Sequence, residues 1–308
     1  MALHRLSRIE IGMPESALLA TAAFYRDFGL AEIASGRFAT TDGGEQLRFS
    51  AAQRRTLLAL TVGVDDADDL GRAAASLAKL GVASERAGAT LRAQEPVTQV
   101  RVTLAIEPRS VQMPAPQLAT NGPGRSLRLN ARSTAAVASE KPRPRKLSHV
   151  VTASTDPAAT RRFFVDGLGF RVSDEVGGMG AAFLRCSSDH HNLLVQPGPF
   201  AFLHHTAWEM DDVDAVGAAA AAMVAADPKR HCWGLGRHAI GSNYFWYLRD
   251  PAGNFAEYTS DLDVIADEEA WKVASSLPAH GLAAWAPPVP REFLAPEDIV
   301  ALARSEAR

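Results

Sequence analysis

The sequence predicts an α+β fold in which each half of the chain contains two units, each made of a strand, a helix and three further strands (βαβββ). Three observations lead to this prediction: the second half of the 308-residue chain repeats the first, the strand segments alternate in facing, and helical stretches in both halves stop at glycine. A chain of this length is long enough for two domains, each with a core of its own.

The repeat begins with a strand that leads into a helix. Residues 6–14 (LSRIEIGMP) match residues 147–155 (LSHVVTAST), and the helical stretches 23–30 and 162–170 follow them. Both stretches end around a glycine, which is a common residue at helix ends. The match therefore predicts the first strand and the first helix of each half.

A second strand and helix follow in each half. Residues 57–66 parallel residues 203–212, and both segments close on a pair of aspartates. Aspartate is a preferred helix N-cap, so these four aspartates are interpreted as helix starts without a chemical role: Asp65, Asp66, Asp211 and Asp212. The alanine-rich run 215–226 then predicts a packed helix that is too short to cross a membrane.

Composition divides the chain into four regions. The stretch between the two halves is rich in Pro, Ser, Arg and Ala and has no periodicity, as is typical of a linker. The last segment contains tryptophans and a Pro-rich stretch, which favours docking on the body of the protein. We predict an N-terminal domain over residues 1–107, a linker over 108–146, a C-terminal domain over 147–263 and a docking tail over 264–308.

Charge and apolar content exclude several classes of partner. The formal net charge is -3 and the two signs are mixed along the chain, so neither a nucleic-acid nor a membrane surface is expected. The N-terminus has no apolar segment after its basic residues, which predicts a cytoplasmic protein that acts on small molecules. Two isolated cysteines, Cys186 and Cys232, form neither a disulfide framework nor a zinc knuckle.

Three polar residues interrupt apolar strands of the second half: His149, His205 and Glu257, separated by 205 − 149 = 56 and 257 − 205 = 52 residues. Burying such groups is costly unless they are paired or bind a metal, and a shared ion would satisfy all three. Two imidazoles and one carboxylate leave adjacent coordination positions open, as non-haem Fe(II) requires, whereas structural zinc usually has four protein ligands. The residues alone therefore predict an iron site, although an isolated strand histidine is more often structural.

The first half provides an internal comparison. The positions that match the three candidate ligands hold Arg8, Ala59 and, by the alignment of the two halves, Val102. None of these residues is a suitable metal ligand. Because the repeat forms without the trio, we interpret the trio as functional.

These residues resemble the type I extradiol ring-cleavage dioxygenases of the vicinal oxygen chelate superfamily, which also includes glyoxalases and bleomycin-resistance proteins. The resemblance covers both halves and is sharpest in the second. The motifs that carry it are LSH ending at His149, DHH ending at His191, HHTAWE at 204–209, GRH ending at His238, and YLRDPAGNFAE at 247–257. The chain departs from the family at Ala239 and Ile240, where Asn and Asp often follow the histidine.

The resemblance implies two vicinal-oxygen-chelate domains, each curling its βαβββ pair round a central cavity, with a degenerate N-terminal domain and a catalytic C-terminal domain. It implies that the trio binds Fe(II), with Mn(II) as the alternative, and that His205 is the ligand and His204 only its neighbour. It also implies an acid/base role for His191, and places His238 and Tyr247 at the substrate oxygens. A turn, an exposed loop and aromatic packing are the respective structural alternatives for these three residues, and His190 is read as a neighbour only.

The implied function is oxidative meta-cleavage of a catecholic aromatic compound with O2, by a homo-oligomeric enzyme of aromatic hydrocarbon catabolism. Two alternatives stay open at this point. The first is a non-oxidative metalloenzyme of the same superfamily, such as a glyoxalase-like lyase or an isomerase. The second is a metal-free protein of the same fold that binds a small molecule.

Overall fold

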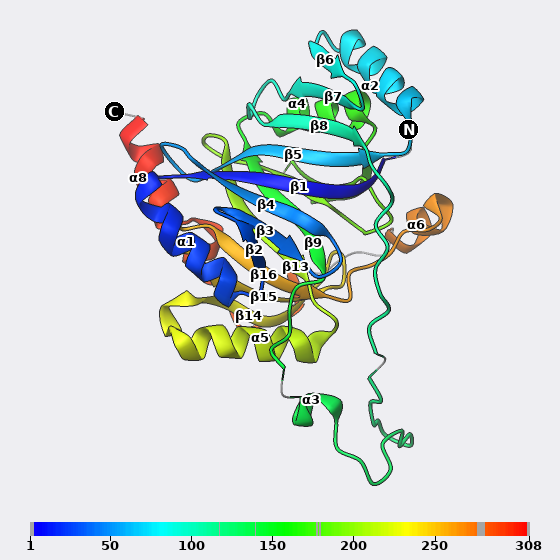
Figure 1. Cartoon of the computed structure of the whole chain (residues 1–308), viewed down its shortest axis with the longest axis vertical. Coiled ribbons are helices and arrows are strands. Elements are labelled where there is room, and N and C mark those ends of the chain that lie inside the picture. Colours follow the sequence, from blue (N-terminus) through cyan, green and yellow to red (C-terminus); the bar gives the residue numbers. More distant parts are fainter. Residues whose placement is uncertain are drawn as a thin grey trace.

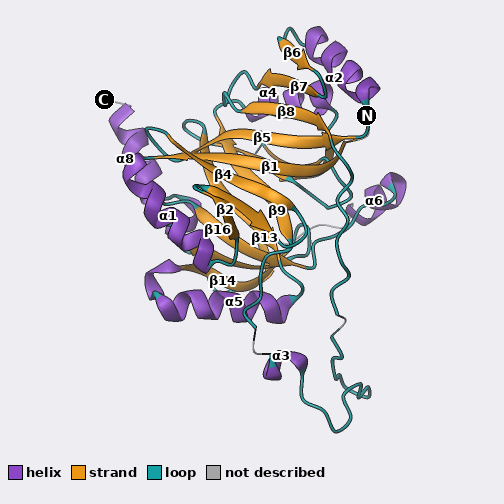
Figure 2. Cartoon of the chain, in the orientation of Figure 1, coloured by secondary structure: helices purple, strands orange, loops and turns teal. Residues whose placement is uncertain are grey.

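The computed structural model describes residues 3–116, 118–138, 140–176, 178, 180–275 and 281–306. Two large mixed sheets, partly covered by helices, make up the fold (Figure 1 and Figure 2). The strands and helices follow one another as four βαβββ modules, two in each sheet, so the predicted α+β fold is confirmed.

The first sheet has the strand order β2-β3-β4-β1-β5-β8-β7-β6. Its strands are β1 (Leu3–Met13), β2 (Ala31–Ala34), β3 (Arg37–Thr40), β4 (Gly44–Ala51), β5 (Thr56–Val64), β6 (Ser84–Ala87), β7 (Thr90–Gln94) and β8 (Arg101–Ile106). The first module carries helix α1 (Glu15–Asp27) and the second carries helix α2 (Ala67–Lys79).

The second sheet repeats this arrangement in the order β10-β11-β12-β9-β13-β16-β15-β14-β17. Its strands are β9 (Lys146–Ser154), β10 (Arg171–Val176), β11 (Ala181–Arg185), β12 (Leu193–Pro197), β13 (Phe202–Glu209), β14 (His231–His238), β15 (Tyr244–Arg249), β16 (Phe255–Ser260) and β17 (Ala283–Trp285). The helical segments of its two modules are α4 (Pro157–Arg162), the π-helical turn η1 (Phe163–Leu168), α5 (Val213–Ala226) and the 3-10 turn η2 (Pro228–Arg230).

The helix boundaries follow from local chemistry that the sequence analysis identified in part. The carboxylate of Asp66 accepts hydrogen bonds from the backbone N–H groups of Asp68 and Asp69, and Asp212 caps α5 in the same way at Ala215. Gly169 follows η1 with a φ of 88°, a left-handed conformation that favours glycine. Asp66 and Asp212 therefore start helices as predicted, whereas Asp65 and Asp211 form ion pairs with Arg109 and Arg145.

Strand pairing corrects the alignment of the two halves at one position. Ala207 lies opposite Glu257 between β13 and β16, and its counterpart Thr61 lies opposite Thr103 between β5 and β8. The first-half equivalent of Glu257 is therefore Thr103, and the assignment to Val102 was wrong. Neighbouring residues of a strand face opposite sides, and Val102 is a buried residue of the hydrophobic core.

The two sheets are held together by aromatic packing from helix α1. The ring of Phe28, directly after α1, stacks on Tyr258 of β16 with 3.8 Å between centroids, and the Tyr258 hydroxyl donates to the Phe28 carbonyl. Tyr25 lies edge-on to Trp208 of β13 with centroids 6.2 Å apart. The first helix of the chain thus packs against the strands that carry the second half's polar trio.

The segment between the sheets is a long excursion that contains helix α3 (Thr134–Val137) and extends away from the body (Figure 1). Its first part contacts the second sheet, since the Gln112 amide donates to the Glu209 carboxylate at 2.8 Å. Its last part returns to the body through an ion pair of 2.9 Å between Arg145 and Asp42. Both ends are therefore tied to the sheets.

The chain after β16 returns to the second sheet as α6 (Glu268–Ser275), β17, α7 (Arg291–Leu294) and α8 (Glu297–Glu306). The Trp271 indole donates to the Ser173 carbonyl at 2.9 Å, whereas Trp285 is 49% exposed. Both cysteines are buried and unpaired. Among the helices of the described residues, none has the length and apolar character of a membrane span.

Candidate metal centre

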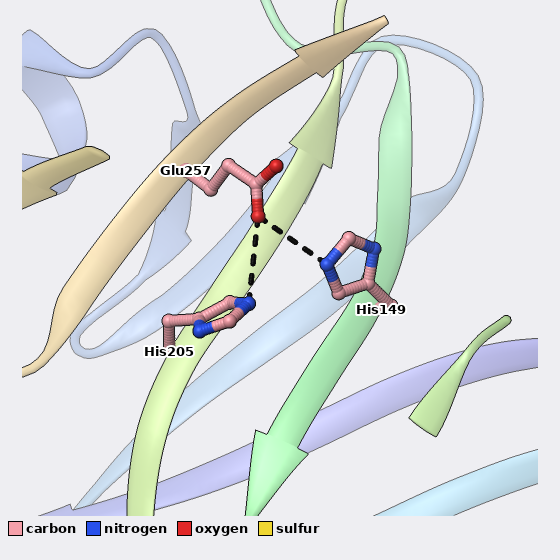
Figure 3. A group of neighbouring side chains, drawn as sticks. All are labelled: His149, His205 and Glu257. Atoms are coloured by element: carbon pink, nitrogen blue, oxygen red, sulfur yellow. Dashed lines mark ion pairs between the residues drawn. The ribbon is translucent and has the colours of Figure 1, made fainter. Parts of the chain in front are cut away.

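Three neighbouring strands of the second sheet bring His149, His205 and Glu257 together (Figure 3). Nε2 of His149 lies 3.3 Å from Oε2 of Glu257, and Nε2 of His205 lies 3.5 Å from the same oxygen. The candidate ligand atoms of the three residues all lie within 4.8 Å of one another. Metal–ligand bonds of about 2.1 Å fit a cluster of this size.

The donor set has the properties that a metal ion would require. Glu257 is fully buried, and its Oε2 atom has no hydrogen-bond partner among the described residues. A buried carboxylate oxygen without a hydrogen bond is costly, and a bound cation would remove that cost. Burial, and after it the nearby His204 and His149, keep the pKa of His205 well below its usual value, so its imidazole is neutral and free to ligate.

A second histidine sets the tautomer of His205. Nε2 of His204 donates to the carbonyl of Phe293 at 2.8 Å, because a carbonyl can only accept. Burial lowers the pKa of His204 to about 4, so the ring is neutral and its Nδ1 accepts a hydrogen bond of 2.8 Å from Nδ1 of His205. Nε2 of His205 therefore carries the lone pair that faces the cluster.

Glu257 and His149 are also oriented by their neighbours. The Asn243 amide donates to Oε1 of Glu257 at 3.1 Å and to the Thr259 hydroxyl at 2.8 Å. The Ser148 hydroxyl lies 3.2 Å from Nδ1 of His149. These contacts hold both ligands by the atoms that point away from the cluster.

His191 lies against the cluster at the end of a hydrogen-bonded chain. Its ring centroid is 4.1 Å from that of His149, and its Nδ1 lies 2.9 Å from Nδ1 of His190. Nε2 of His190 contacts the Asp174 carboxylate at 2.8 Å, which makes this nitrogen the donor. Where His190 Nδ1 accepts from Nδ1 of His191, the lone pair of the neutral His191 ring is on Nε2.

His238 and Tyr247 form a hydrogen-bonded pair beside His205. Nδ1 of His238 donates to the Leu282 carbonyl at 3.0 Å, and its Nε2 lies 2.8 Å from the Tyr247 hydroxyl. Burial, and then the Glu257 carboxylate, raise the pKa of Tyr247 well above its usual value, so the phenol stays protonated. The structure thus gathers all six residues that the sequence singled out.

Aromatic rings from the sheet and the tail surround this pair. Phe293 of α7 lies 4.5 Å from the Tyr247 ring and 6.3 Å from the His205 ring, measured between centroids. Phe293 packs with Trp233, Phe245 and Phe255 in one buried cluster. The apolar wall beside the polar trio is therefore built partly by the tail.

The sequence analysis missed four contributors to the site. His190 and His204 were read as mere neighbours, although the His-His pairs at 190–191 and 204–205 are a visible signal. Asn243 and Phe293 have no local pattern that marks them, because their positions depend on the fold of the loop and the tail.

The profile of the Glyoxalase/Bleomycin resistance protein/Dioxygenase superfamily matches residues 146–258. A relative named metapyrocatechase 2, from Cupriavidus necator, is 39% identical over 153 residues, which are 49% of this chain and 47% of the relative. An iron-dependent extradiol dioxygenase of Rhodococcus jostii is 31% identical over 136 residues, 40% of this chain and 45% of the relative. The matches thus span about half the length of these relatives.

Solved structures share the fold over most of the chain. The 2,2',3-trihydroxybiphenyl 1,2-dioxygenase of Sphingomonas wittichii superposes with a TM-score of 0.70 and 19% identity over 94% of this chain and 100% of that one. A Mn(II)-bound glyoxalase from Novosphingobium aromaticivorans superposes with a TM-score of 0.65 and 26% identity over 86% and 84%. Residues 146–258 thus match the Glyoxalase/Bleomycin resistance protein/Dioxygenase superfamily, and the chain shares its fold with these solved structures.

Proposed function

We propose that this protein is an extradiol dioxygenase that uses Fe(II) and O2 to cleave the ring of a catecholic aromatic compound beside its hydroxyl groups. The observation that carries the proposal is the convergence of two imidazoles and one buried carboxylate, whose Oε2 has no hydrogen bond, on a single point, with His191 and the His238–Tyr247 pair beside them. The names of the two relatives agree with this activity.

His149, His205 and Glu257 would hold the iron, and Mn(II) is the alternative ion. Two histidines and one carboxylate form the ligand set that non-haem Fe(II) enzymes use, and it leaves adjacent positions for a catechol and for oxygen. An ion bound there would supply the Lewis acidity and the electron transfer that the ring needs in order to react with O2.

His191 is suited to move protons at the reacting ring. Its Nε2 carries a lone pair in the tautomer that the Asp174–His190 chain imposes. Burial, and then the neighbouring His149, hold the pKa of His191 well below its usual value, which keeps the ring neutral before substrate arrives. It can therefore accept a proton from a catechol hydroxyl and return it later in the reaction.

Tyr247 and His238 are suited to orient the substrate. Because Nδ1 of His238 donates to Leu282, its Nε2 accepts the proton of the Tyr247 hydroxyl. The tyrosine oxygen then has lone pairs free to accept a hydrogen bond from a substrate hydroxyl. The Phe293 ring and the neighbouring aromatic residues would exclude water from this side of the ring.

The proposal is tested by loading the full chain with Fe(II) under anaerobic conditions and adding a panel of catechols in oxygenated buffer. We expect oxygen uptake and the yellow colour of a ring-cleavage product, and we expect neither in the His205→Ala variant. Absence of uptake across the panel by a chain that retains iron would contradict the proposal.

A second candidate is a non-oxidative metalloenzyme, and the resemblance to the Mn(II)-bound glyoxalase favours it. Such an enzyme would act equally well without oxygen. An assay under argon, with methylglyoxal–glutathione adduct as the added substrate and Mn(II) as the ion, separates the two candidates. Turnover in this assay, together with no reaction of catechols in oxygenated buffer, would select the non-oxidative enzyme.

The cytoplasmic location and the homo-oligomeric state belong to the same proposal. They rest on the sequence arguments given above and on the family resemblance. Sedimentation of the purified chain would give its oligomeric state directly.

A further inference from the structure

A cavity of about 820 Å³ opens on the first sheet, on the face that corresponds to the metal centre of the second sheet. Strand pairing defines one row of side chains across its floor. Arg8 of β1 lies opposite Thr61 of β5, Thr61 lies opposite Thr103 of β8, and Thr103 lies opposite Arg92 of β7.

The corresponding row of the second sheet is part of the metal centre. There His149 lies opposite Ala207, Ala207 opposite Glu257, and Glu257 opposite Tyr247. The fold therefore places an arginine at the position of the histidine ligand and a threonine at the position of the carboxylate ligand. The row of the second sheet can bind a cation. The corresponding row of the first sheet lines a cavity and carries positively charged arginines instead.

The charges in this cavity do not cancel. Four arginines and two glutamates line it: Arg8, Arg48, Arg92, Arg101, Glu10 and Glu85.

One of these glutamates is already paired. Glu10 accepts from Arg101 at 3.0 Å and from the Ser50 hydroxyl at 2.6 Å. Glu85 is exposed and lies opposite Arg92, without an ion pair between them. Arg101 is thus neutralised by Glu10.

The two arginines at the ends of the row, in contrast, lack a partner. Among the residues that the structure describes, the side chains of Arg8 and Arg92 make no hydrogen bond or ion pair with another residue. Burial, and then the guanidinium of Arg48, lower the pKa of the half-buried Arg8, while the more weakly acting Glu45 and Glu107 raise it. An anion is the group that such a site lacks.

The dimensions and the lining indicate what kind of anion would fit. Strands β1 and β7 are three strand spacings apart, about 14 Å, so arginines at the two ends of the row can both reach a molecule in the middle. Hydroxyl groups of Thr61 and Thr103 lie between them, and the alanines Ala59 and Ala83 give an apolar lining. A phosphate ion alone would leave most of this volume empty.

We propose that the cavity of the first sheet is a binding site for a small organic acid, whose carboxylate pairs with Arg8 or Arg92 and whose apolar body lies over the alanines. A guanidinium donates two parallel hydrogen bonds to a carboxylate, which gives such a pair both strength and orientation. The site is separate from the proposed iron centre and shares no residue with it.

The test is calorimetric titration of the full chain with sodium benzoate, with sodium phosphate as a second probe. We expect saturable benzoate binding that weakens at least about tenfold in Arg8→Gln and in Arg92→Gln, because each variant removes a charge-assisted pair. Arg109→Gln is the matched control, since this exposed arginine pairs with Asp65 outside the cavity, and it should bind benzoate like the wild type.

Crystals soaked in 4-bromobenzoate locate the site independently. The anomalous signal of bromine is expected over the first sheet between β1 and β7. Because Arg92 is exposed, Arg92→Gln should melt at the wild-type temperature, which separates lost binding from lost folding.

Three results would overturn the proposal. They are benzoate binding that both arginine variants leave unchanged, a bromine signal beside Glu257, and saturable binding of phosphate without binding of benzoate.

Discussion

At the scale of single residues, the site is a set of paired contacts in which one side chain fixes the proton of the next. The carbonyl of Phe293 accepts a hydrogen bond from His204 and so sets the tautomer of that ring. His204 in turn sets the tautomer of the ligand His205. In the same way, Asp174 sets the tautomer of His190, and His190 sets the tautomer of His191. Each chain leaves the Nε2 lone pair of its second histidine outside these hydrogen bonds, at His205 and at His191.

We predict opposite effects of Glu257→Gln on stability and on iron binding. In the metal-free chain the substitution removes a buried carboxylate oxygen that has no hydrogen bond and keeps the oxygen that Asn243 contacts, so the free energy of unfolding should rise by about 1 to 3 kcal/mol. Fe(II) should then raise the melting temperature of the wild type but not of the variant. Equal stabilisation of both proteins by Fe(II) would show that this carboxylate is not a ligand.

Asp174→Asn should reduce kcat about tenfold and leave KM and the iron content unchanged, because it loosens the tautomer of His191 without touching the ligands. The pH profile of kcat should shift as well, which a purely structural defect would not cause. Glu175→Gln is the matched control, since Glu175 pairs with Arg161 at the surface. An unchanged kcat in Asp174→Asn would exclude the positioning role.

At the scale of secondary structure elements, strand register places the chemistry. The β9–β13–β16–β15 pairings align His149, Ala207, Glu257 and Tyr247 in one row across the sheet. The turn between β15 and β16 keeps this register, and Asp250 stabilises the turn by accepting from the backbone and the side chain of Asn254 at 2.9 and 3.0 Å.

The raised pKa of Asp250 leads us to predict that its contribution to stability is lost at higher pH. Burial raises its pKa from 3.8 to about 6 in the folded chain, so between these values the folded state binds more protons than the unfolded state. The contribution of Asp250 to stability is thus present below pH 4 and is lost as the pH rises through 6. The free energy of unfolding of Asp250→Asn, relative to the wild type, should therefore increase by about 3 kcal/mol between acidic and alkaline buffer.

Urea unfolding at about pH 4 and about pH 8 measures this difference directly. The exposed Asp214 offers a control in Asp214→Asn, which should follow the wild type at both pH values. A relative stability of Asp250→Asn that does not change with pH would contradict the raised pKa.

At the scale of the whole molecule, the first half, the second half and the tail meet at one arginine. The buried guanidinium of Arg55 donates to the carbonyl of Leu203, next to the His204–His205 pair, and to the Asp298 carboxylate of α8 at 2.6 and 3.1 Å. This contact joins the loop before β5 to the strand of the metal centre and to the tail that contributes Phe293.

Arg55→Met should lower the free energy of unfolding by about 2 kcal/mol, because it leaves a buried carbonyl unpaired and frees a partly exposed aspartate. Limited proteolysis should also release the tail sooner than in the wild type. Arg26→Met, which breaks only an exposed ion pair with Glu32, serves as the control. A tail that resists protease equally in all three proteins would refute this role of Arg55.

The comparison of sequence and structure shows which features pattern alone reveals. The internal repeat predicted the βαβββ modules and the polar trio, because both depend on spacing along strands. The misassignment of Val102 in place of Thr103 arose because a shift of one residue exchanges the two faces of a strand. The roles of His204, Asn243 and Phe293 depend on contacts between distant segments, which no local pattern contains.

The most direct test of the central claim is anomalous diffraction at the iron absorption edge from crystals grown with Fe(II). We predict a single strong peak within bonding distance of His149 Nε2, His205 Nε2 and Glu257 Oε2, about 2.1 Å from each. An iron peak elsewhere in the chain, with these three side chains left without an ion, would contradict the account.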